Sequence, residues 1–187
     1  MIARLEGKIK ESDLNWIILD VGGVGYKVFV SQDILSKPTG ADIVLYTHLY
    51  IRDNIQELYG FENLEKLKIF EALISVSGVG PKGALGILSH SDTKKIKEAI
   101  ALENPTIFTV VPGIGRKMAS KIILELKNKL TGEELSAALP KDLEEASQAL
   151  AGLGYSRTEI TKVFSEIPKD IKNPQEQTEW ALKKLGK

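Results

Sequence analysis

A short glycine-rich phrase occurs twice in this 187-residue chain, 35 positions apart. Residues 77–82 read Ser-Gly-Val-Gly-Pro-Lys, and residues 112–117 read Pro-Gly-Ile-Gly-Arg-Lys. Apolar residues recur at helical spacing after both copies, and the two runs align in register: Ala84 with Ala119, Ile87 with Ile122, Leu88 with Ile123. Each copy therefore predicts a tight turn that opens a helix.

Such a turn has the properties of a phosphate-binding site. Glycine allows a positive φ and leaves no Cβ in the way of a ligand. The following helix begins with unpaired N–H groups and a partial positive charge, which favour an anion. Lys82 and Lys117 stand at the same offset and add a full charge. Either copy alone could be a purely structural turn, but two in-phase copies predict a ligand with repeated phosphates, namely nucleic acid.

The first copy also fits the G-x-G-x-x-G pattern of dinucleotide-binding folds, through Gly78, Gly80 and Gly83. That pattern needs a strand before the turn, whereas the residues ahead of this copy have helical spacing. The second copy carries Met118 where the third glycine would stand. We therefore reject the dinucleotide interpretation.

Charge separates the middle of the chain from its ends. The whole chain is neutral, with 25 Lys and Arg against 25 Asp and Glu. Residues 65–130 hold 11 basic and 6 acidic residues, for +5, whereas residues 1–64 (6 and 9) carry −3 and residues 131–187 (8 and 10) carry −2. The positive segment is the one with the repeated turns, which supports a polyanionic ligand there.

The composition excludes several kinds of site. The chain has no cysteine and only two histidines, His48 and His90, so we expect no disulfide, no metal and no cofactor. It has no nucleophile–base constellation and no P-loop pattern, so we expect it not to be an enzyme by itself. The N-terminus lacks an apolar signal core and no run reaches membrane-spanning length, which predicts a cytoplasmic protein without membrane contact.

Turn residues and changes of period divide the chain into four segments. Residues 1–63 contain five strand-like runs (2–9, 14–21, 24–30, 43–50 and 56–61), which predict an OB-type β-barrel. Residues 64–130 are helical in pattern, residues 131–140 lack a period and predict a flexible linker, and residues 141–187 predict a small three-helix module. The expected fold is multidomain α+β, and such a tethered module is more often a docking unit than a catalyst.

In this order the segments resemble the RuvA family. The resemblance rests on residues 1–7 (Met-Ile-Ala-Arg-Leu-Glu-Gly), on Leu-Tyr-Gly-Phe at 58–61, on the segments 73–82 and 111–117, and on Leu-Gly-Tyr at 153–155. It implies a tandem helix-hairpin-helix domain and a subunit that holds Holliday junctions, four-way DNA structures, open for branch migration. It also implies a homotetramer or octamer, the RuvB hexameric ATPase as partner and source of ATP hydrolysis, and the RuvC resolvase as a further candidate partner.

The resemblance assigns roles to three sets of residues. The DNA-binding set comprises Gly78, Val79, Gly80, Lys82, Gly113, Ile114, Gly115, Arg116 and Lys117. The partner-binding set, which would contact RuvB, comprises Leu150, Leu153, Gly154 and Tyr155.

The third set is a pin at the junction crossover, and it maps onto Asp53 and Asn54. By its residues alone, this segment is an ordinary polar hairpin tip. The family usually has two acidic residues here, so we expect weaker electrostatic opening of the crossover.

Two other functions stay open. A helix-hairpin-helix nuclease or glycosylase would need a catalytic residue near the hairpins, for which Lys82 or Asp92 could be proposed, although no metal-binding acid cluster accompanies them. A general single-strand-binding scaffold would use the barrel, yet residues 1–64 are net acidic. We expect structure-specific, sequence-independent binding instead, because amides and lysines contact phosphates and not base edges.

Overall fold

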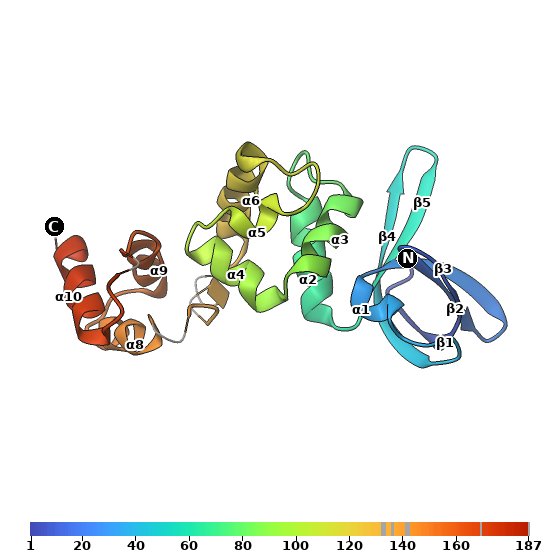
Figure 1. Ribbon diagram of the computed structural model, residues 1–187, viewed down its shortest axis with the longest axis horizontal. Helices are drawn as coiled ribbons and strands as arrows, with labels where there is room; N and C mark the ends of the chain where they lie inside the picture. Colours follow the sequence, from blue (N-terminus) through green and yellow to red (C-terminus); the bar gives the residue numbers. More distant parts are fainter. Residues whose placement is uncertain (132–133, 136, 141–142, 169, 187) are drawn as a thin grey trace. The chain divides into compact units, whose positions relative to one another are not determined.

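The computed structural model describes residues 1–131, 134–135, 137–140, 143–168 and 170–186 (Figure 1). The chain divides into two compact units. Unit 1 comprises Met1–Thr93 and Val111–Gly113, and unit 2 comprises Lys94–Val110 and Ile114–Lys187. Within the described residues, no helix is both long enough and apolar enough to cross a bilayer.

Unit 1 begins with a closed five-stranded barrel, which confirms the barrel predicted from the sequence. Its strands are β1 (Arg4–Ser12), β2 (Trp16–Val21), β3 (Val24–Val30), β4 (Asp42–Arg52) and β5 (Ile55–Phe61). The strand order is β1-β2-β3-β5-β4, with β3 and β5 parallel and the other pairs antiparallel. Alternate side chains point inward, so the core is aliphatic and includes Ile9, Ile17, Leu19, Val28 and Leu45.

Turns and a short helix shape the ends of the barrel. Gly22 and Gly23 both have positive φ, 61° and 89°, and form the turn between β2 and β3. The helix α1 (Gln32–Leu35), which the sequence did not predict, places Ile34 in the barrel core. The β4–β5 hairpin projects beyond the barrel (Figure 1) and turns at Asp53 and Asn54.

The helices α2 (Leu64–Ile74) and α3 (Pro81–His90) complete the continuous part of unit 1. Asn63 caps α2 by accepting a hydrogen bond from the Lys66 N–H. Phe70 of α2 is fully buried against β5, with its ring centroid 5.1 Å from that of Tyr59 and 4.8 Å from that of Phe61. These aromatic contacts join α2 to the barrel.

Unit 2 continues the helical region with α4 (Thr93–Ala101), α5 (Thr106–Thr109) and α6 (Arg116–Lys129). Asn104 and Pro105 directly precede α5, and Asn104 Oδ1 accepts a hydrogen bond from the Thr106 N–H at 3.1 Å. Glu103 has a positive φ of 51°, and its carboxylate lies 2.6 Å from the Lys127 ammonium of α6. The buried face of α6 consists of Ala119, Ile122, Ile123 and Leu126.

The last part of unit 2 contains α8 (Glu144–Gly152), α9 (Arg157–Ser165) and α10 (Pro174–Leu185). Gly154, in the turn after α8, has a φ of 92°, and the Tyr155 N–H donates to the Leu150 carbonyl. Ser156 and Glu159 then form a capping box on α9, and the hydrogen bonds from Ser156 lower the pKa of Glu159. The three helices are those that the sequence predicted.

The predicted linker, residues 131–140, is described only in part, because residues 132, 133 and 136 lie outside the described residues. Among the others, Leu135, Ala138 and Leu139 are buried. The Leu135 N–H donates to the Thr131 carbonyl at 3.1 Å. The flexibility of this segment stays a prediction.

Candidate nucleic-acid interface

The two glycine phrases adopt the same backbone geometry. The first glycine of each has a positive φ, 98° at Gly78 and 88° at Gly113, a region that favours glycine. The second glycine of each is an extended N-cap: Gly80 precedes α3 with φ −86° and ψ 167°, and Gly115 precedes α6 with φ −81° and ψ 173°. The repeat in the sequence is thus a repeat in backbone conformation.

The middle residue of each turn is buried and does not lie on the surface. Val79 is 7% exposed and Ile114 is 8% exposed. Their side chains therefore cannot contact DNA, and within the predicted DNA-binding set they could contribute only backbone groups. The Val79 N–H is already used, because it donates to the Val76 carbonyl at 3.0 Å.

No side chain caps α3 or α6, and neither helix has an acidic residue in its first turn. This differs from α2, α9 and α10, whose N-caps Asn63, Ser156 and Asn173 accept hydrogen bonds from their own helices. First-turn N–H groups of α3 and α6 thus receive no side-chain cap and carry the positive end of the helix dipole.

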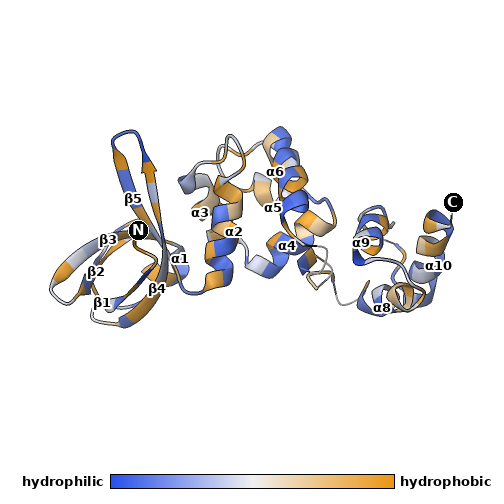
Figure 2. Cartoon of the chain, turned by 180° about the vertical axis from the view of Figure 1, so that it is seen from behind, coloured by the Kyte–Doolittle hydropathy of each residue, from blue (hydrophilic) through white to orange (hydrophobic). Residues whose placement is uncertain are grey.

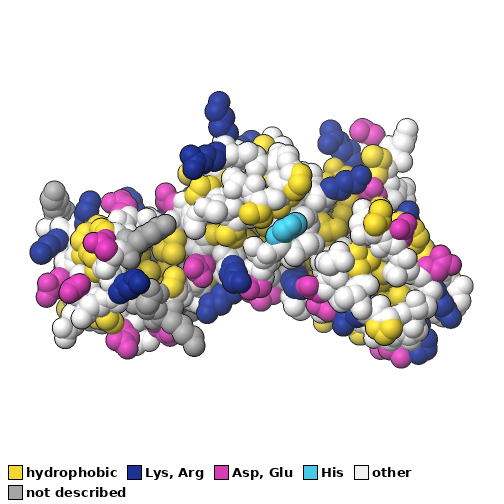
Figure 3. All heavy atoms as spheres, in the orientation of Figure 1, with side chains coloured by type: hydrophobic (Ala, Val, Ile, Leu, Met, Phe, Trp, Pro, Cys, Tyr) yellow, Lys and Arg dark blue, Asp and Glu magenta, His cyan; other side chains and the backbone are white. Residues whose placement is uncertain are grey.

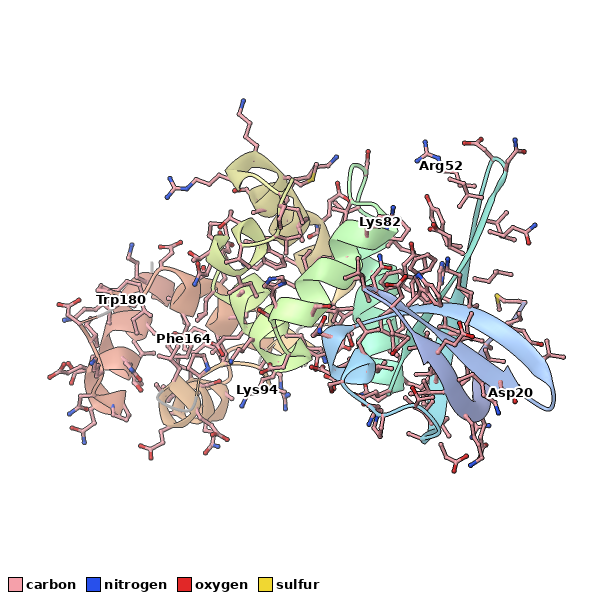
Figure 4. The ribbon with its side chains drawn as sticks, turned by 45° about the vertical axis from the view of Figure 1, so that its right-hand side comes forward. Asp20, Arg52, Lys82, Lys94, Phe164 and Trp180 are labelled. Atoms are coloured by element: carbon pink, nitrogen blue, oxygen red, sulfur yellow. The ribbon has the colours of Figure 1, made fainter. Side chains whose placement is uncertain are left out.

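Three exposed cations stand at these uncapped helix starts. Lys82 lies at the beginning of α3, where Figure 4 labels it. Arg116 and Lys117 are the first two residues of α6, and Figure 3 shows dark-blue side chains projecting from this end of the helix. Both turns therefore combine unpaired donors with positive charge, which is a suitable environment for a phosphate group.

The backbone conformation does not explain the glycines at positions 80 and 115. Any residue can adopt their φ values, and a Cβ at either position would meet no atom within 4 Å. Ser, Thr, Asp or Asn at an N-cap would also accept a hydrogen bond from the helix. Glycine instead leaves open space directly in front of the uncapped N–H groups.

The predicted pin lies at the end of the β4–β5 hairpin. Asp53 has a φ of 51°, a conformation that Asp and Asn tolerate better than most residues. Its Oδ2 lies 3.7 Å from Nε of Arg52, which Figure 4 labels. Glu57 is not at the tip, because it lies in β5 and accepts a hydrogen bond from the Tyr59 hydroxyl at 2.7 Å. Burial of Tyr59 and this hydrogen bond raise the pKa of the tyrosine.

The predicted partner-binding set divides into one core residue and one surface turn. Leu150 is fully buried in the C-terminal part, so its side chain cannot be a contact surface. Leu153 is 62% exposed and is followed by Gly154 and Tyr155 in the turn between α8 and α9. The resemblance grouped the four residues together, whereas the structure separates the buried Leu150 from the exposed turn.

A metal-dependent site would need a cluster of ligands. Among the described residues, no group of three or more His, Asp or Glu side chains is placed to hold a metal ion. Lys82, which a helix-hairpin-helix enzyme could use, is an exposed residue at the start of α3.

Three domain families match the chain in sequence order. They are RuvA N terminal domain at residues 1–60, SAM-like Helix-hairpin-helix tandem at residues 70–128, and RuvA, C-terminal domain at residues 141–185. The chain belongs to the RuvA family. The predicted RuvA-like order of barrel, tandem helix-hairpin-helix domain and C-terminal helical domain is thereby confirmed.

Full-length relatives support this assignment. The Holliday junction branch migration complex subunit RuvA of Halothermothrix orenii is 42% identical over 189 residues, which cover all of this chain and 96% of the relative. Proteins of the same name from Caldanaerobacter subterraneus subsp. tengcongensis and Exiguobacterium sp. are 39% and 37% identical over 192 and 195 residues, and these matches cover both chains completely. The similarity to RuvA proteins therefore extends over the whole chain.

Proposed function

We propose that this RuvA family member binds Holliday junction DNA through its phosphate backbone, as a subunit of a branch migration complex in recombination and repair. The names of its full-length relatives support the proposal. In the chain itself, the observation that carries it is the pair of open, uncapped helix starts at Gly80 and Gly115. Glycine at these positions weakens the helix cap and makes room for a ligand.

Each glycine hairpin would bind a phosphate with first-turn N–H groups and a nearby cation. Lys82 supplies the charge at α3, and Arg116 and Lys117 supply it at α6. These groups do not contact base edges, so binding would be independent of sequence. Each phosphate contact would contribute a slope of about −0.9 to the logarithm of affinity against the logarithm of salt concentration.

A homotetramer would match the four arms of a junction, and two tetramers could enclose it as an octamer. The avidity of several weak hairpin contacts would then give strong binding that depends on the shape of the DNA. The tip formed by Asp53 and Asn54 would lie at the crossover. The proposed site of action is the cytoplasm, where the chromosomal DNA of bacteria lies.

The chain itself would be non-catalytic, with ATP hydrolysis supplied by RuvB. The surface turn from Leu153 to Tyr155 is the proposed RuvB contact, and the RuvC resolvase is a further proposed partner. In the proposed organisation, residues 1–63 form the barrel and residues 64–130 bind DNA. Residues 131–140 form a linker, and residues 141–187 contact RuvB.

A gel-shift comparison at two salt concentrations tests the proposed function. An immobile four-way junction should bind more tightly than linear duplex or single strand of the same sequences, and binding should weaken with salt. Equal binding to all three DNAs would contradict the proposal. Preference for the single strand would favour the barrel scaffold, and nicking of the junction in Mg²⁺ would favour an enzyme.

The variants Gly80→Ala and Gly115→Ala test the assigned site. Each should fold with a somewhat lower melting temperature, because alanine is a weaker N-cap than glycine. Each should also lose about tenfold in junction affinity, because the methyl group enters the space proposed for a phosphate. Gly152→Ala is the matched control, since a Cβ there also meets no atom within 4 Å. Unchanged affinity in both hairpin variants would remove the site from the proposal.

A further inference from the structure

Two exposed isoleucines lie directly below the polar tip of the β4–β5 hairpin. Ile51 is 62% exposed and Ile55 is 50% exposed. Figure 2 shows a hydrophilic turn (blue) with hydrophobic segments (orange) beneath it on both strands. Single exposed apolar residues are common on protein surfaces. Here, however, two of them flank the tip of a hairpin that projects from its domain.

The two isoleucines lie on opposite faces of the hairpin. Ile51 pairs with Gln56 and Ile55 pairs with Arg52, and residues paired across strands share a face. Ile51 therefore continues the face of Leu58, which is buried in the barrel core. Ile55 continues the opposite face, to which Tyr59 belongs. Both faces of the projecting end thus present an apolar side chain to solvent.

The tip carries no net charge that could repel DNA. Arg52 and Asp53 have opposite charges 3.7 Å apart, and Asn54 is neutral. This distance is far below the screening length of about 10 Å at 0.1 M salt, so a phosphate near the tip meets a dipole and not a net negative charge. The remaining acid of this turn region, Glu57, lies lower on the hairpin with its hydrogen bond to Tyr59.

We propose that Ile51 and Ile55 form an apolar wedge that enters the stacked bases at the crossover and holds the strands apart. The proposal rests on the junction-binding function above and concerns how the crossover is opened. Apolar side chains can enter a base step, partly unstack it and cover the freed base faces. Contact between isoleucine and base faces would offset the lost stacking, which the neutral tip cannot do by repulsion.

The arrangement of the isoleucines favours bases over a protein partner. A protein that docks on a strand buries an apolar patch on one face. A wedge between two separated base stacks contacts both, and this hairpin is apolar on both. The neutral tip also allows close approach to the phosphates that surround a crossover, whereas an acidic tip would resist it.

Fluorescence of 2-aminopurine placed beside the crossover of an immobile junction would measure opening at saturating protein. Ile51→Ser with Ile55→Ser should reduce the opening equilibrium about tenfold, because the apolar contact area is lost. Junction affinity in a gel shift should stay near the wild-type value, because phosphate contacts provide it. The conservative pair Ile51→Leu and Ile55→Leu should keep the opening.

One control separates the wedge from a general loss of exposed apolar surface. Leu14→Ser removes a more exposed apolar side chain (90%) from another loop of the barrel and should leave opening unchanged. Circular dichroism would verify that every variant is folded.

The possible failures are distinguishable. Wild-type opening in the double serine variant overturns the wedge. The wedge is also overturned if the wild-type protein binds the junction without any rise in 2-aminopurine fluorescence. Wild-type protein that shows no preference for the junction overturns the proposed function itself and, with it, the inference.

Discussion

The two glycine hairpins share a backbone conformation but differ in chemistry. The hairpin before α3 has Pro81 at its first helical position and one cation, Lys82, whereas the hairpin before α6 begins with Arg116 and Lys117. Proline has no N–H, so the second hairpin offers one more donor as well as one more charge. The comparison shows that the shared backbone geometry allows both turns to bind a phosphate. The number of cations and of N–H donors determines how strongly each turn binds it.

The largest effect should come from removing the conformation that the hairpins share. Gly78→Val and Gly113→Val place a β-branched residue at positive φ, which costs about 1–3 kcal/mol and should weaken junction binding about tenfold or more in either hairpin. Gly113 has open space in front of it, so the cost there is backbone strain and not a clash. Gel shifts would compare the two variants, and Gly113→Asn should retain more affinity than Gly113→Val. Normal affinity in either valine variant would show that its hairpin does not hold DNA.

A smaller effect should separate the hairpins by charge. Lys82→Gln should reduce the salt-dependence slope by about 0.9 per subunit, and the double variant Arg116→Gln with Lys117→Gln by about 1.8. Junction affinity measured at several salt concentrations gives both slopes. Lys129→Gln, at the other end of α6, is the control and should change the slope little. Equal slopes for the single and double variants would show that the extra cation contacts no phosphate.

The smallest effect should come from the proline that distinguishes the first hairpin. Pro81→Ala restores an N–H at the start of α3 and should raise junction affinity slightly at low salt. It should also lower stability by about 0.4–1 kcal/mol, because the unfolded chain gains freedom. Thermal melting and a gel shift of the same protein would measure both changes. A fall in affinity would mean that the rigid ring, and not the missing donor, governs this hairpin.

Local features made the hairpins and most elements predictable. A repeated phrase followed by helical periodicity specifies a turn and a helix within about ten residues, and the strand-like runs at 14–21 and 24–30 predicted β2 and β3. The amino-acid sequence alone does not distinguish the positive φ of Gly113 from the negative φ of Gly115, because the φ of each glycine depends on the helix geometry around it. The different roles of the two glycines therefore needed the structure.

Other features could not be predicted from the sequence, for physical reasons. The helix α1 is only 4 residues long, which is too short to show a helical period. Ile51 and Ile55 have the β-branched character of ordinary strand residues, and their exposure follows from the length by which the hairpin leaves the barrel. The burial of Leu150 separates it from the surface turn that follows, although all four predicted partner residues are neighbours in the chain.

The parallel pairing of β3 with β5 also determines when the barrel can be completed during synthesis. Val28 pairs with Leu58, so the closing contact joins residues 30 positions apart, whereas the caps between α8 and α9 form within a few residues. Long-range pairing has a larger loop-closure entropy and forms more slowly. The emerging chain therefore exposes unpaired strand edges, which are prone to aggregation, until β5 has left the ribosome. We expect barrel closure to limit the folding rate, with the contact between Tyr59 and Phe70 forming only afterwards.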